Sequence, residues 1–325
     1  MDDLSPEQDK KVSELQIKLA SELAKYPEIN TKWSLLRFCR ARQFDMKKVE
    51  TMLLNFIKWR DSKDMKRIAS RDYKDYAHII EHHEEGRYGV DKLGRPVIID
   101  RVGLSNTKEI MNHNDLETIE DYFIQMFERN IFIEFPLASA LAGKRVEQSF
   151  LVIDLKNVNI GRLFDSKFKN FLKFIAVMSQ DYYPEALGKM FIVNAPFLFK
   201  GVWAFVKIWL DKKTKNKIEM HGDVPIKRIQ EFIGLANLPI FLHGSCKLSL
   251  RDNFGPWKDE IKNSISRKSF YLSDRTAEYE YFYTEGERKA LGISLKEHNK
   301  LNVDMVKFEN HEVLHDTEIE FSQLD

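Results

Sequence analysis

The chain has 325 residues, of which 43% are hydrophobic and 31% charged, a composition that excludes intrinsic disorder and allows a substantial buried core. The formal net charge of +1 excludes a strong overall field, so we expect no nucleic acid partner. Two cysteines, Cys39 and Cys246, exclude a disulfide scaffold and fit a reducing, cytoplasmic compartment.

Two further features of the composition bear on the class of protein. The polar start MDDLSPEQDKK predicts no secretory signal, and no run reaches the roughly 18 apolar residues that a membrane span needs. The 23 Phe, 11 Tyr and 5 Trp residues are unusually numerous, which fits either a large core or a wide apolar cavity. Composition alone favours the core.

The first 80 residues are predicted to form a helical N-terminal subdomain. SPEQ at residues 5–8 has the form of a capping box with proline at the first helical position, so a helix should run to about Lys25. TKWSLLRFCRAR predicts a second helix. A third is predicted after Asp45, the N-cap of DMKKVETMLLNFIKWRDS, whose apolar residues share one face.

Residues 81–259 alternate between predicted strands and helices. A turn at Asp91–Gly94 precedes the first strand. The predicted strands cover residues 96–102, 149–155, 190–196 and 238–244. The predicted helices cover residues 115–132, 168–180, 197–210 and 227–235. This order predicts an α/β domain with a mainly parallel sheet.

The segment 260–325 looks like an extension. Its regularity is low and its last 15 residues hold five acids and no Lys or Arg. Part of it could lie on the surface, or it could complete the core.

The predicted helix Phe197–Leu210 is apolar nearly all round, apart from Lys200 and Lys207 on one stripe. Such a helix is either buried or in contact with lipid, and these residues alone favour a buried helix. The lysines of the following DKKTKNK suit either a solvated helix end or an anionic membrane, at about 1 kcal/mol for each lysine near the surface.

Several longer stretches resemble one family. Between about residues 31 and 259, the chain is similar to CRAL-TRIO lipid-binding proteins, most of all to their phosphatidylinositol/phosphatidylcholine transfer branch, the Sec-fourteen-like proteins. The stretches that carry the resemblance are LLRFCRARQFD, DKLGRPV, FLVIDLKNV, SQDYYPEALGKMFIVNAPFLF and DNFGPWKD. The resemblance implies a sheet that floors a hydrophobic pocket, a gating helix, and one bound phospholipid that is exchanged at membranes.

The resemblance also implies four headgroup residues for phosphatidylinositol: Arg42, Glu185, Thr214 and Lys217. Their chemistry suits this role, because a phosphodiester needs cations and donors while inositol hydroxyls need acceptors. Without the resemblance, Arg42 and Glu185 would be interpreted as a structural ion pair. Lys212, Lys213 and Lys215 are expected to stay solvated or to face the membrane.

The gate is expected to correspond to the apolar helix. Its residues that would close the cavity or meet the membrane are Phe197, Phe199, Trp203, Phe205, Val206 and Trp209.

A second ligand is harder to predict. The family's phosphatidylcholine positions fall on Ser149, which is kept, and on Leu151, Arg87 and Ile98, which depart from the pattern. Tyr88, beside one of these positions, is the nearest aromatic residue, and choline favours aromatic faces. Ser149 and Tyr88 therefore mark a possible second site, whose occupant could be another phospholipid, a sterol-like molecule or a prenyl lipid.

Two histidine motifs could suggest metal chemistry. HEVLH at residues 311–315 matches the zinc-protease pattern, but the neighbouring HDTEIEF alternates like a strand and only ten residues follow. EHHEEG at residues 81–86 is interpreted as a solvated loop. We expect no metal, no cofactor and no enzyme activity.

The predicted function is therefore binding of a single phospholipid, most simply phosphatidylinositol, and its transfer or presentation at membranes. We expect a cytoplasmic monomer with transient, peripheral contact to intracellular membranes. The alternative is an interaction module that binds another hydrophobic ligand, or a protein such as a small GTPase, through residues 260–325.

Overall fold

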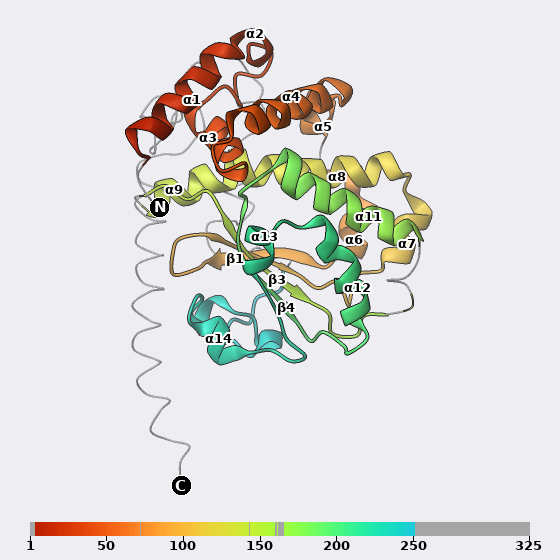
Figure 1. The fold of residues 1–325 in the computed structure, drawn as a ribbon. Helices are drawn as coiled ribbons and strands as arrows, with labels where there is room; N and C mark the ends of the chain where they lie inside the picture. The colour runs from red at the N-terminus through yellow and green to blue at the C-terminus, as the bar shows by residue number, and fades with distance from the viewer. Residues whose placement is uncertain (1–3, 72, 143, 160, 162–165, 251–325) are drawn as a thin grey trace, which may run out of the picture.

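A computed structural model describes residues 4–71, 73–142, 144–159, 161 and 166–250 of the chain. DNFGPWKD, HEVLH and the whole extension 260–325 therefore lie outside the described residues. The fold is a five-stranded sheet with helices on both faces and a helical region at one end (Figure 1).

The sheet is mainly parallel, as predicted. Its strands lie in chain order: β1 (Glu85–Val90), β2 (Pro96–Asp100), β3 (Ser149–Asp154), β4 (Leu187–Val193) and β5 (Ile218–Met220). Strands β1 and β2 form an antiparallel hairpin, and the other pairs are parallel. The predicted turn joins the hairpin, with the Gly94 amide donating to the Asp91 carbonyl over 2.8 Å. Gly94 takes a left-handed φ of +80° that favours glycine.

Three sheet predictions were wrong or incomplete. Strand β1 was missed because its sequence, EGRYGV, has two glycines and no clear alternation, and β5 because it has only three residues. Residues 238–244 form no strand. Ile240–Leu242 is a 3₁₀ turn closed by bonds to the Pro239 carbonyl, and a short apolar run cannot separate these alternatives.

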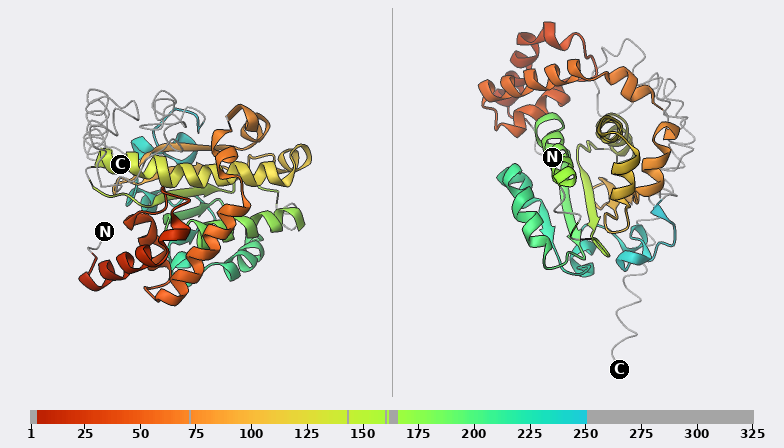
Figure 2. Two further views of the ribbon diagram at one scale, coloured as in Figure 1. Left: turned by 90° about the horizontal axis from the view of Figure 1, so that it is seen from above. Right: turned by 90° about the vertical axis from the view of Figure 1, so that its right-hand side faces the viewer.

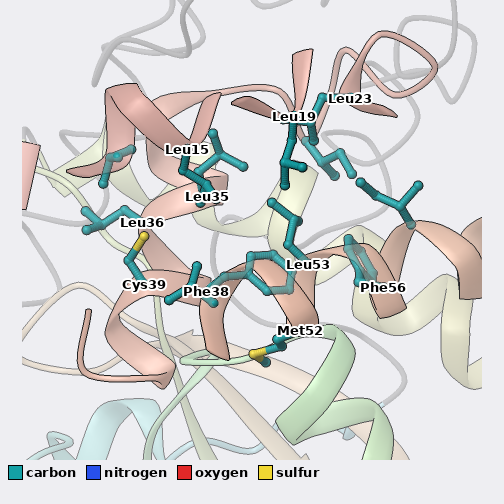
Figure 3. Packing of buried hydrophobic residues seen from close by; sticks show 14 of the residues in the cluster. Leu15, Leu19, Leu23, Leu35, Leu36, Phe38, Cys39, Met52, Leu53 and Phe56 are labelled. Atoms are coloured by element: carbon teal, nitrogen blue, oxygen red, sulfur yellow. The ribbon is translucent and has the colours of Figure 1, made fainter. Parts of the chain in front are cut away.

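The N-terminal region contains four packed helices: α1 (Pro6–Lys18), α2 (Ala20–Leu23), α3 (Lys32–Ala41) and α4 (Met46–Ser62). The capping box at Ser5 and the cap at Asp45 form as predicted. The first predicted helix is interrupted at Leu19, whose φ of −106° departs from helical geometry. Figure 3 shows the leucine-rich core, in which Leu15, Leu35 and Leu53 point toward one another.

The remaining helices surround the sheet. They are α5 (Met65–Ser70), α6 (Ala77–His82), α7 (Thr107–His113), α8 (Leu116–Arg129), α9 (Phe135–Ala142), α11 (Ser166–Val177), α12 (Phe199–Val206), α13 (Lys212–Asn216) and α14 (Ile226–Gln230). Figures 1 and 2 show α8 and α11 between the sheet and the helices α1–α4, and α14 on the far side of the sheet. The expected subdomain boundary after residue 80 falls inside α6.

The two faces of the sheet pack against different partners. Phe150, Val152 and Phe191 lie on the face covered by α14 and the residues after it. Ile153, Met190 and Ile192 point the other way, toward α11 and α12. This division follows from the two-residue period of a strand. We call the second side the cavity face.

One buried ion pair ties the helical region to the rest. Arg60 of α4 is fully buried, and its Nη1 and Nη2 donate to the two oxygens of Glu128 in α8 over 2.7 and 3.3 Å. Nη2 also donates to Glu28 Oε1 over 2.7 Å, and the Tyr183 hydroxyl donates to Glu128. A buried cation is stable only with such partners, so this network specifies how the two parts dock.

Candidate functional site

A cavity of about 380 Å³ lies between the cavity face of the sheet and the helices α7, α8, α11 and α12. Most of its wall is hydrocarbon. From the sheet come Ile98, Leu151, Ile153, Met190 and Ile192, and from the helices come Phe123, Phe127, Phe171, Val202 and Trp203. Part of the high aromatic content therefore lines a cavity, which composition alone had not favoured. Such a wall suits an apolar ligand.

Several polar side chains of the cavity gather at one of its ends. Strands β3, β4 and β5 are parallel, so their first residues lie at one edge of the sheet. Ser149, Glu185, Leu187 and Lys217 lie at or just before these starts and line that end of the cavity, which we call the headgroup end. The opposite end lies where β2 and β3 finish.

Lys217 and Lys213 share one carboxylate at the headgroup end. Lys213 Nζ lies 2.6 Å from Glu185 Oε1, and Lys217 Nζ lies 3.5 Å from Glu185 Oε2. Lys217 Nζ also donates to the Leu187 carbonyl over 2.7 Å. Burial lowers the pKa of Lys217 from its ordinary value, and the Glu185 carboxylate opposes that shift. The cluster is a compact set of two cations and one anion.

Thr214 joins this cluster through α13. Asp211 caps that helix by accepting from the Thr214 amide over 2.7 Å, and both residues line the cavity with Lys217. Thr214 and Lys217 therefore lie on one side, as their spacing predicted. Lys213 is 58% exposed, as the solvated or membrane-facing alternative predicted, and its ammonium group in addition pairs with Glu185.

Glu185 has an unusual backbone conformation. Its φ of +61° is left-handed, which is uncommon for a residue other than glycine. The preceding Pro184 carbonyl accepts from Arg37 Nη2 over 2.8 Å, so a buried guanidinium supports the loop. Burial lowers the pKa of Arg37 to about 10, and Glu185 opposes the shift. Held strain of this kind often marks a binding residue.

The structure places Arg42 apart from the other three predicted headgroup residues. Its Nη2 donates to Asp181 Oδ1 over 3.1 Å, and it faces a shallow surface depression with Lys47 and Trp59 instead of lining the cavity. Arg42 and Glu185 form no ion pair with each other. Sequence reasoning missed Arg37, although it lies in LLRFCRARQFD, one of the stretches that carry the family resemblance.

The apolar helix covers one side of the cavity, but it is shorter than predicted. Helix α12 ends at Val206, and a 3₁₀ turn covers Lys207–Trp209. Gln180 explains the break, because its side chain donates to the Trp209 carbonyl and accepts from the Asp211 amide. A side chain that satisfies these backbone groups competes with continued helix.

The six predicted gate residues divide between two sides. Phe199, Trp203 and Val206 line the cavity, whereas Phe205 and Trp209 are half-buried and pack edge to face with ring centroids 4.3 Å apart. Phe197 is 77% exposed. Two apolar residues that were not predicted, Leu198 and Ile208, are 64% and 67% exposed. We call Phe197, Leu198 and Ile208 the apolar patch.

The possible second site is only partly present. Ser149 lines the cavity, and its hydroxyl donates to the Ala186 carbonyl over 3.3 Å. Tyr88 does not line it. In β1 the neighbouring Arg87 faces the cavity, so the two-residue period turns Tyr88 into the opposite core, where its hydroxyl donates to Leu248.

Arg87 belongs to a buried ionic network in the cavity wall. Its Nε donates to Glu134 Oε1 over 3.0 Å and its Nη1 pairs with Glu85, while Arg129 also reaches Glu134 at 3.2 Å. Asn130 lines the same wall, and its Oδ1 is buried without a hydrogen-bond partner. Sequence patterns did not predict this network.

His83 also lies in the cavity wall, contrary to the solvated loop expected for EHHEEG. Its Nε2 is 3.5 Å from Asp100 Oδ1 and its Nδ1 is 3.3 Å from the Tyr122 hydroxyl. The side chain turns inward because α6 ends at His82 and the chain then enters β1.

Comparisons with known proteins agree with this architecture. A model of the CRAL/TRIO domain matches residues 80–244, and a model of the CRAL/TRIO N-terminal domain matches residues 11–55. The crystal structure of Sfh5 is similar in fold, with a TM-score of 0.59, 17% identity, and coverage of 78% of this chain and 92% of that one.

Two curated relatives are similar over most of this chain. Phosphatidylinositol/phosphatidylcholine transfer protein SFH7 of Arabidopsis thaliana is 31% identical over 274 residues, or 82% of this chain and 50% of the relative. SEC14 cytosolic factor of Yarrowia lipolytica is 31% identical over 260 residues, or 79% and 52%. The chain thus spans about half the length of these relatives.

Proposed function

This chain belongs to the CRAL/TRIO family, and from that premise we propose that it binds one phosphatidylinositol molecule in its cavity and carries it between membranes without chemical change. The observation that carries the proposal is the union of an apolar cavity with the cluster of Lys213, Lys217 and Glu185 at one end. The name of the Arabidopsis thaliana relative, which specifies transfer of phosphatidylinositol and phosphatidylcholine, supports it.

The phosphate of the headgroup would replace Glu185 as the partner of the two lysines. In the structure this carboxylate pairs with both Lys213 and Lys217, which leaves one net positive charge. A phosphodiester offers the same lysines a second anion, and the Thr214 hydroxyl can donate to it. Glu185 is then free to accept hydrogen bonds from inositol hydroxyls. The arrangement suits a headgroup that combines a phosphate with several hydroxyls.

The apolar wall would hold the acyl chains. A phospholipid has roughly 30 chain methylenes, and each costs about 0.8 kcal/mol to expose to water. Desorption of the free lipid into water therefore costs about 24 kcal/mol. The cavity replaces one hydrocarbon environment by another, which leaves a small net exchange energy. The rate then depends on how α12 opens the cavity at a membrane.

The apolar patch, whose residues flank α12 at its two ends, would make that membrane contact. Phe197, Leu198 and Ile208 stand beside the exposed lysines Lys200 and Lys207, an arrangement that suits an anionic bilayer surface. Among the described residues, no helix is long and apolar enough to cross a membrane. We therefore propose peripheral and transient association of a cytoplasmic protein.

Phe197→Ser together with Ile208→Ser should slow phosphatidylinositol transfer between vesicles by about tenfold or more. Each fully inserted apolar side chain contributes about 1.5–3 kcal/mol, and serine removes that contribution. Stability should change little, because both side chains are exposed. Initial rates with labelled lipid, together with binding to the same vesicles in a flotation assay, measure the effect.

The matched control is Ile17→Ser with Leu116→Ser, which removes two apolar side chains of 78% and 60% exposure from α1 and α8 and leaves the apolar patch intact. Its transfer rate should equal that of the wild type. Equal rates for both double variants would mean that the apolar patch does not touch the membrane during exchange.

Phosphatidylcholine should be transferred at least about tenfold more slowly than phosphatidylinositol. A quaternary ammonium group favours aromatic faces, at about 2 kcal/mol when desolvated. Here the part of the wall that β1 forms carries Arg87, which is paired with Glu85 and Glu134, while Tyr88 points away. Vesicle assays with each labelled lipid test this, and comparable rates would refute the proposed preference.

Mass spectrometry of lipid that co-purifies with the full chain tests the function as a whole. Phosphatidylinositol should be the main species. If none is bound and vesicle transfer is absent, the alternative of a partner-binding module gains support. The residues proposed for such a partner, 260–325, lie outside the described residues.

A further inference from the structure

A cluster of three imidazoles and one carboxylate lies outside the cavity, where α6 meets α7. His78 and His82 are four residues apart on α6, and Glu109 and His113 are four residues apart on α7. Each pair therefore shares one face of its helix. The two helices lie in contact, side by side in Figure 1, so the two faces meet.

The distances within this cluster suit one small ion. One ligand atom from each of His78, Glu109 and His113 lies within 4.8 Å of the others. His113 Nδ1 is 3.0 Å from Glu109 Oε1, and the His78 ring centroid is 5.1 Å from that of His113 and 4.6 Å from that of His82. Bonds of about 2.0–2.1 Å in a tetrahedron need ligand atoms about 3.4 Å apart. Small side-chain rotations would suffice, since these residues are partly exposed.

The local structure holds the two helices together at this point. Asn114 follows α7, and its Nδ2 lies 3.0 Å from His78 Nδ1 and donates to the Ile110 carbonyl over 2.9 Å. The cluster is thus supported by packing and hydrogen bonding across the helix pair, and it does not depend on a loop.

We propose that His78, Glu109 and His113 bind one Zn²⁺ ion, and that His82, whose ring centroid lies 4.6 Å from that of His78, rotates to become the fourth ligand. Imidazole nitrogen and carboxylate oxygen are ordinary zinc ligands, whereas Ca²⁺ and Mg²⁺ prefer sets made of oxygen alone. Four protein ligands leave no open position, so the site is structural.

The ion would stiffen one end of the cavity. Ile79 of α6 and Ile110 and Met111 of α7 line the cavity at the end opposite Glu185. An ion that links the two helices therefore reduces their independent motion. Amide hydrogen exchange across residues 107–113 should slow when zinc is added.

Titration of the metal-free full chain with Zn²⁺ alone, monitored by calorimetry, tests the site without any lipid. One ion per chain should bind, and Co²⁺ in its place should give the visible absorption of a tetrahedral complex. His78→Ala and His113→Ala should each weaken affinity by at least about tenfold, the smallest effect expected from loss of a direct ligand.

Two controls separate this site from other histidines. His221→Ala removes a half-exposed histidine elsewhere and should leave the affinity unchanged. His311→Ala with His315→Ala disrupts HEVLH and should also leave it unchanged. The proposal is overturned if the wild type binds no stoichiometric zinc, if His78→Ala and His113→Ala fold and bind normally, or if binding depends only on HEVLH. Circular dichroism of each variant shows whether it folds.

Discussion

Glu185→Ala combined with Lys217→Ala is expected to reduce phosphatidylinositol transfer by about a hundredfold. Hydrogen bonds to charged groups contribute about 1.5–3 kcal/mol each, and the double variant removes one acceptor for inositol and one cation for phosphate. A loss of about 3 kcal/mol corresponds to that factor. Initial rates of labelled phosphatidylinositol transfer between vesicles are the measurement.

The control for this variant is Lys212→Ala with Lys215→Ala. It removes two positive charges from the same short helix, but neither lysine lines the cavity. Between vesicles of low anionic content its transfer rate should stay within about threefold of the wild type, because the attraction of about 1 kcal/mol for each lysine requires an anionic surface. If the two double variants lose the same activity, charge near the membrane matters and the headgroup site does not.

The second large effect concerns stability. Arg60→Leu should lower the free energy of unfolding by about 3–5 kcal/mol, because it leaves the buried Glu128 carboxylate without its cation. Glu28, the other carboxylate that Arg60 contacts, is also largely buried, and burial already raises its pKa. Chemical denaturation followed by tryptophan fluorescence measures the change.

Two comparisons show whether the buried charge is responsible. Arg60→Leu with Glu128→Leu should recover part of the loss, since an apolar pair can replace a buried ion pair. Lys25→Ala breaks the exposed pair with Asp61, 3.4 Å apart, and should cost less than about 1 kcal/mol. A small effect of Arg60→Leu would indicate that water reaches Glu128.

Sequence patterns predicted some features well because their causes are local. The capping box at Ser5 and the N-cap at Asp45 depend only on residues three positions away. The buried strands around residues 149–155 and 190–196 were visible as continuous apolar runs. The resemblance grouped Arg42, Glu185, Thr214 and Lys217, and in the structure the last three line one cavity whereas Arg42 does not.

The errors have equally specific causes. Tyr88 was placed at a ligand site although its position depends on which face of β1 it occupies. Strand β1 itself was not predicted. The length of the apolar helix depended on Gln180, which lies 29 residues before Trp209 and competes for its backbone carbonyl. Neither the orientation of Tyr88 nor the hydrogen bond of Gln180 can be predicted from the neighbouring residues in the sequence.

The order of apolar runs in the sequence was enough to indicate an α/β fold, and the resemblance of its longer stretches to one family indicated lipid binding. Hydrophobic periodicity and capping depend on residues a few positions apart, so they can be recognised in the sequence alone. Packing between distant elements decides the rest: that Lys213 shares Glu185 with Lys217, that Arg42 faces Asp181, and that His78 meets His113. These pairings depend on how helices and strands are set against one another in space, which no short stretch of sequence encodes.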